Sequence, residues 1–93
     1  MDTFVILRRG GWATADDVGA AGKRSSTALS KMDGEVRWLR SYFLTEPNGR
    51  LGSVCVYQAT DAEAVRRHAQ AADLPVDEIV PVADLVVVET DPA

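Results

Sequence analysis

Residues 36–59 read VRWLRSYFLTEPNGRLGSVCVYQA, and this stretch decides the fold. The segments 36–45 and 51–59 are rich in β-branched and aromatic residues, so both are predicted strands. Between them, Pro47-Asn48-Gly49 is a strong turn signal. The middle of the chain is therefore predicted to form an antiparallel β-hairpin.

Side chains alternate between the two faces of a strand, which assigns the hairpin residues to faces. Strict alternation in residues 36–45 predicts one face with Val36, Trp38, Arg40, Tyr42 and Leu44, and the other with Leu39, Ser41 and Phe43. In residues 51–59, Cys55 and Tyr57 share a face opposite Val54 and Val56. The alternation does not say which of these faces meets the helices.

On the N-terminal side of the hairpin, a strand and a helix are predicted. The strand covers Thr3 to Leu7 and ends at Gly10-Gly11. The helix begins near Thr14, whose hydroxyl can accept from free backbone N–H groups, and Asp16 and Asp17 suit its positive end. Asp33-Gly34 ends this helix.

On the C-terminal side, a second helix and a last extended segment are predicted. The spacing of Thr60 and Glu63 has the form of a capping box, which opens a helix that runs to about Ala72. Leu74-Pro75 ends that helix. Residues 79–82 and 85–90 then supply the extended segment, interrupted by Pro81 and Asp84.

The resulting order, β-α-β-β-α-β, predicts an α+β ferredoxin-like fold with a four-stranded antiparallel sheet. In that fold both helices cover one face of the sheet, and a solvated second face would show polar residues at alternate positions. Segments such as 4–7, 54–57 and 85–88 are instead apolar on both faces. We therefore expect a second copy to cover the open face, giving a homodimeric α/β barrel.

The composition, with 46% hydrophobic and 26% charged residues, is that of one globular domain spanning residues 1–93. A net charge of −4 and scattered basic residues argue against nucleic-acid binding. No apolar stretch is long enough for a membrane span, and the charge order at the start is wrong for a signal peptide. The single cysteine excludes an intramolecular disulfide, so we expect a cytoplasmic protein.

Few side chains can carry chemistry, and the first candidates are the single cysteine, Cys55, and the single histidine, His68. Cys55 is either a small packed residue, a metal ligand or thiol lining a cavity, or a nucleophile. His68 is either a half-buried histidine bonded to a neighbouring group or a metal or ligand contact. One of each excludes a two-histidine metal site or a CxxC zinc site within one subunit.

The second candidates are the aromatic residues Trp38, Tyr42 and Tyr57. They either line a pocket with a few polar groups or form dimer core in which the hydroxyls find partners. The carboxylates form no obvious acid–base pair, so no catalytic residue is predicted.

The elements Trp38-x-x-Ser41-Tyr42, Cys55-Val56-Tyr57 and Arg66-x-His68-Ala69 together resemble a family of small bacterial proteins that includes a streptomycete nickel-binding protein. The resemblance runs from about residue 4 to residue 88. It implies a ferredoxin-like homodimer, with nickel or another divalent metal as the cofactor. It also implies Tyr42, Cys55, Tyr57 and His68 as ligand or pocket residues, of which Cys55 and His68 are the predicted metal ligands. The chain departs from the family pattern at Gly10-Gly11-Trp12, in the 46–51 turn and at Asp73-Leu74.

Three functions remain open at this point. The first is a metal-binding protein, in which a dimer doubles the supply of donors. The second is a cofactor-free small-molecule binder or an enzyme such as a monooxygenase, cyclase or isomerase, by analogy with other dimeric α/β barrels. The third is a non-catalytic interaction or sensing module. The resemblance places the metal-binding protein first.

Overall fold

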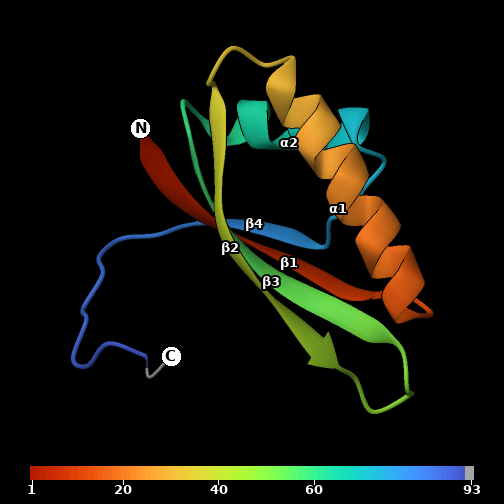
Figure 1. The fold of residues 1–93 in the computed structure, drawn as a ribbon. Coiled ribbons are helices and arrows are strands. Elements are labelled where there is room, and N and C mark those ends of the chain that lie inside the picture. Colours follow the sequence, from red (N-terminus) through yellow and green to blue (C-terminus); the bar gives the residue numbers. More distant parts are fainter. Residues whose placement is uncertain (92–93) are drawn as a thin grey trace.

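The computed structural model describes residues 1–91 and shows two helices on one face of a four-stranded sheet (Figure 1). Its elements are β1 (Asp2–Trp12), α1 (Ala15–Ser30), β2 (Val36–Thr45), β3 (Leu51–Ala59), α2 (Ala62–Ala71) and β4 (Glu78–Pro81). The strands lie in the order β2-β3-β1-β4, and all neighbours are antiparallel. The predicted ferredoxin-like fold and its central hairpin are confirmed.

Both helices begin at capping residues. At α1, the Thr14 hydroxyl accepts from the backbone N–H of Asp17 at 3.2 Å, and the Asp17 carboxylate accepts from that of Thr14 at 3.3 Å. The predicted cap of α2 is wrong by one residue: Asp61, not Thr60, accepts from the backbone N–H of Ala64 at 2.8 Å. Thr60 is held outside the helix because its own N–H donates to the carbonyl of Glu35 at 3.1 Å.

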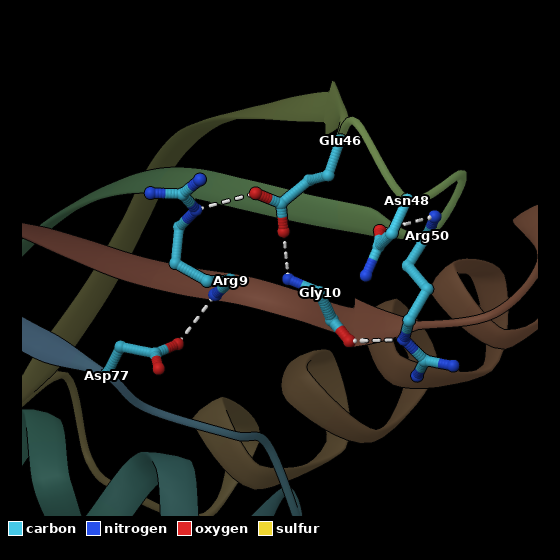
Figure 2. Close-up of polar contacts among 6 residues, drawn as sticks. All are labelled: Arg9, Gly10, Glu46, Asn48, Arg50 and Asp77. Carbon is cyan, nitrogen blue, oxygen red and sulfur yellow. Dashed lines mark hydrogen bonds and ion pairs between the residues drawn. The ribbon is translucent and has the colours of Figure 1, made fainter.

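β1 is longer than predicted, because Gly10-Gly11 forms an irregularity within the strand and does not end it. The pairing with β3 shifts between Arg8 and Trp12, and Gly10 has a φ of +55°. Two carboxylates accept hydrogen bonds from backbone N–H groups there (Figure 2): Glu46 accepts from Gly10, and Asp77 accepts from Arg9 at 2.6 Å. Glu46 also accepts from the Arg9 Nε at 2.6 Å. Side chains thus replace the ladder bonds that the irregularity removes.

β2 contains a bulge that the strict alternation did not anticipate. Trp38 lies opposite Tyr57, but the next pair is Arg40 with Val56, so Leu39 is an extra residue. An extra residue reverses the faces of everything that follows it. The predicted common face of Trp38 and Tyr42 is therefore wrong: Val36, Trp38, Ser41 and Phe43 face the helices, and Arg40, Tyr42 and Leu44 face away from them.

β4 is shorter than predicted, and residues 85–90 form no strand. β4 runs antiparallel to β1 and pairs Pro81 with Phe4, and the N–H of Val82 then donates to the carbonyl of Thr3 at 2.9 Å. At that point β1 has reached its own first residues, so the following residues have no strand to pair with. The segment after β4 runs away from the helix layer (Figure 1).

The core lies between the sheet and the helices. It is built from buried residues of β1, β2, β3 and α2: Phe4, Ile6, Val36, Cys55, Tyr57, Ala59, Ala64 and Val65. The opposite face of the sheet, called here the open face, carries Val5, Leu7, Val54, Val56, Tyr42 and Leu44. Within residues 1–91 no helix or strand covers it, and residues 85–91 line a hollow together with Arg40 and Tyr42. No helix in this part of the chain is long and apolar enough to cross a membrane.

Candidate binding cavity between helix α1 and the sheet

The predicted site residues fall into two groups. Trp38, Cys55 and Tyr57 lie on the helix-facing side of the sheet, and His68 lies on the buried side of α2 with its ring centre 5.3 Å from that of Tyr57. Trp38 and Tyr57 also contact each other, with ring centres 6.4 Å apart. Tyr42 is on the open face and is 50% exposed. The structure therefore brings four of the five predicted residues to one side of the sheet.

A small cavity of about 20 Å³ lies beside these residues, between α1 and the sheet. This is room for one water-sized group. Its polar lining comes from Arg8, Ser25, Ser41, Cys55 and Tyr57, and its apolar lining from Trp12, Val18, Ala21, Gly22, Trp38, Phe43 and Leu74. No aspartate or glutamate lines it.

Arg8 is the residue that the sequence reasoning missed. It is only 1% exposed, and none of its three guanidinium nitrogens has a hydrogen-bond partner among residues 1–91. Its guanidinium carbon lies 5.9 Å from the centre of the Tyr57 ring. The signal was available, because β1 alternation puts Arg8 on the same face as the apolar residues Phe4 and Ile6.

Four of the lining side chains, Trp38, Ser41, Cys55 and Ser25, have defined polar partners. The indole N–H of Trp38 donates to the Ser41 hydroxyl at 2.8 Å, which holds the tryptophan ring at the cavity wall. This bond spans the bulge and requires both residues to share a face. The Cys55 thiol donates to the Ser53 hydroxyl at 3.4 Å. Cys55 is thus free, buried and directed toward the helix layer.

His68 is fully buried and bonded to α1. Its Nε2 lies 3.1 Å from the Ser25 hydroxyl and 3.4 Å from the Ser25 carbonyl oxygen, while its Nδ1 has no partner within the described chain. Burial lowers the pKa of His68 below its usual value, the bond to Ser25 opposes this, and the charge of Arg8 lowers it further. The ring is therefore neutral at pH 7.

Tyr57 responds to the same surroundings. Burial raises the pKa of its phenol, and the positive charge of Arg8 acts in the opposite direction. Tyr57 is 1% exposed. Its hydroxyl therefore stays protonated at neutral pH and is no counter-charge for the guanidinium.

Acid is expected to destabilise the fold through His68. Its pKa is near 6.5 in the unfolded chain and lower in the folded one, so the unfolded state takes up the proton first. The stability that the neutral ring provides is complete above pH 6.5 and is lost as the pH falls toward the folded pKa, by at most about 1.4 kcal/mol per pH unit. Urea unfolding between pH 8 and pH 5 measures this slope.

The matched variant for that experiment is His68→Gln, which removes the only histidine. We expect the variant to be less stable at pH 8, because an ordered buried group is lost. Between pH 6.5 and pH 5.5 its free energy of unfolding should change less with pH than that of the wild type. Equal slopes in the two proteins would show that His68 does not cause the acid sensitivity.

The comparisons with known proteins agree with this architecture. The family model described as "Nickel responsive protein SCO4226-like" matches residues 4–82. The chain belongs to this family. The crystal structure of SCO4226 from Streptomyces coelicolor A3(2) is similar with a TM-score of 0.69, at 23% identity over 90% of this chain and 99% of that chain. At this identity the likeness shows the fold alone. No curated protein matches the chain.

The family description raises the question of whether the predicted ligands fit a nickel ion. Within residues 1–91 no three His, Cys, Asp or Glu side chains gather in a way that could hold a metal. Arg8 lines the same cavity as Cys55 and lies against Tyr57, which His68 contacts, so a cation placed there would meet a like charge. Cys55 and His68 therefore do not fit a nickel ion within one chain, and their role as ligands stays a prediction.

Proposed function

We propose that this protein is a cytoplasmic homodimer that binds nickel or another divalent metal and takes part in a response to that metal. The observation that supports metal binding is membership of a family described as nickel responsive. We place the ligands of this proposal outside the core, because the only histidine and the only cysteine are buried beside a cationic side chain.

The homodimer is supported by the open face. Tyr42 and Leu44 on this face are 50% and 37% exposed, and Leu85 to Val88, which line a hollow with Tyr42, are between 70% and 92% exposed. Large apolar residues in such number mark a face that is covered in the working protein. A second copy is the natural cover, because each copy offers the other the same unpaired apolar sheet surface.

The accessible metal donors at the margin of the open face are carboxylates. Glu78 lies opposite Leu7 in the sheet and so points to the open face, and Asp84 and Glu89 flank the exposed run 85–88. Within residues 1–91 these carboxylates form no group of three that could hold a metal, so the proposed site needs donors from the second copy. A dimer doubles this set. For a given donor set, affinity rises from manganese to nickel, so a shared carboxylate site is expected to bind nickel more tightly than manganese.

The test is calorimetric titration of chelator-treated, tag-free protein with Ni²⁺ and with Mn²⁺. We expect one nickel ion for every two chains, with the shared site on the two-fold axis of the dimer. Glu78→Gln should weaken binding by about tenfold or more. The matched control is Glu63→Gln, which removes an exposed carboxylate from α2, on the other layer, and should leave binding unchanged.

Two further variants decide between the surface and the core. His68→Ala and Cys55→Ser should both retain nickel binding. Loss of binding in either variant, with the fold retained by circular dichroism, would place the metal at the predicted core pair instead. Absence of heat with the wild-type protein would end the metal proposal.

A second candidate function is the binding of a small molecule between the helices and the sheet. One observation favours it: the cavity beside α1 contains a buried arginine that has no partner in the described chain.

A further inference from the structure

The position of Arg8 follows from the alternation of β1. Phe4, Ile6 and Arg8 occupy successive positions on the helix-facing side, and the first two are buried core residues. The strand thus carries a guanidinium into the same layer, where its Nε, Nη1 and Nη2 atoms are each shielded from solvent. Arginine keeps its proton at any pH that a protein tolerates, so the charge cannot be removed by deprotonation.

A buried charge is costly unless an opposite charge and hydrogen bonds compensate it. The ion pairs found within residues 1–91 use other arginines, Arg9, Arg66 and Arg67. The Tyr57 side chain beside Arg8 offers a cation–π contact and a phenol oxygen near the guanidinium, and neither carries a negative charge. The chain itself supplies no counter-charge in this part of the structure.

The surroundings of Arg8 suit an anion. The hydroxyls of Ser25 and Ser41 and the phenol of Tyr57 line the same cavity and can donate hydrogen bonds. The covering second copy proposed above would lie on the opposite face of the sheet and would not reach Arg8. The edge-to-face pair of Trp12 and Phe43, with ring centres 5.9 Å apart, supplies apolar lining, and Phe43 is half exposed.

We propose that Arg8 anchors a small carboxylate anion in this cavity. The forked guanidinium matches a carboxylate in two parallel N–H···O bonds, which is the strongest pairing that arginine makes. The cavity of about 20 Å³ has room for one water-sized group, so the anion has to be short, as formate and acetate are, and the lining has to shift to admit both carboxylate oxygens. This inference rests on the second candidate function and is independent of the metal.

The chain contains its own reporter, because both of its tryptophans, Trp12 and Trp38, line the cavity. The experiment titrates chelator-treated full-length protein with sodium acetate and follows tryptophan emission. Ionic strength is kept constant because each addition of acetate replaces an equal amount of a bulky sulfonate salt. Parallel titrations use sodium chloride and acetamide, the neutral analogue of acetate. Melting temperature is recorded in the same solutions.

We expect saturable binding of acetate and a rise in melting temperature, with chloride at least about tenfold weaker and acetamide without effect. Arg8→Met should abolish the acetate response, and Arg8→Lys should weaken it by about tenfold or more, because an ammonium lacks the fork. Arg37→Met removes an exposed arginine from β2 and should respond as the wild type does.

Four results would overturn the proposal. If chloride binds as tightly as acetate, the site has no preference for carboxylates and the proposed ligand class is wrong. Binding of acetamide without acetate would leave a small-molecule site but remove the anion. A wild-type melting temperature that does not change with acetate would remove the site, whether or not Arg8→Met folds. If the Arg8→Met protein is more stable than the wild type and acetate affects neither protein, Arg8 only packs in the core and binds no anion.

Discussion

Tyr57→Ala is expected to lower the free energy of unfolding by about 3–5 kcal/mol, the usual cost of deleting a buried aromatic ring. Tyr57 is 1% exposed and lies between the Trp38 and His68 rings, with the Arg8 guanidinium also against it. Its removal leaves a void that β3 and α2 cannot close. Urea unfolding followed by circular dichroism measures the loss.

The control is Tyr57→Phe, which keeps the ring and removes only the hydroxyl. We expect it to stay within about 1 kcal/mol of the wild type, the usual net contribution of one hydrogen bond. If the two variants lose stability equally, the hydroxyl and not the ring is the important group, and the packing account of the core would be wrong.

Val5→Asp is expected to shift the proposed dimer to monomers, with association weakened by about 100-fold or more. Val5 is in β1, the inner strand that separates β3 from β4, and its neighbours across the open face are Val56 and Val80. Each dimer would then bury two carboxylates in apolar surroundings. Light scattering coupled to size exclusion, over a range of protein concentrations, measures the shift.

Ser26→Asp adds the same charge on the exposed side of α1 and should leave the dimer intact. Both variants should retain the helix content of the wild type. A wild-type protein that is monomeric throughout the concentration range would contradict the dimer, and a dimeric Val5→Asp protein would move the interface away from the open face.

Much of the fold could be predicted because the signals were local. The turn at Pro47-Asn48-Gly49 fixes the hairpin, and Thr14 starts α1 through groups within three residues of it. The bulge at Leu39 could not be predicted, since it is set by pairing with β3 and leaves no mark in the composition of β2. The end of β4 likewise depends on where β1 begins, which is a property of the assembled sheet.

The candidate site was predicted less well. Trp38, Cys55, Tyr57 and His68 lie on the helix side of the sheet, but Tyr42 does not share the face of Trp38, as strict alternation predicts, because of the bulge. Arg8 was treated as one of several scattered basic residues. A charged residue in phase with buried apolar positions of a strand is the pattern that would have revealed it.

The segment after β4 has a consequence for handling the protein. Leu85-Val86-Val87-Val88 is an exposed run with high β propensity, the kind of segment that stacks into intermolecular sheets. Pro81 precedes it and Asp84 and Glu89 flank it directly, and these residue types interrupt such stacking. Neutralising the two acids would remove the repulsion between like segments, so we expect the purified chain to aggregate faster without these two side-chain charges.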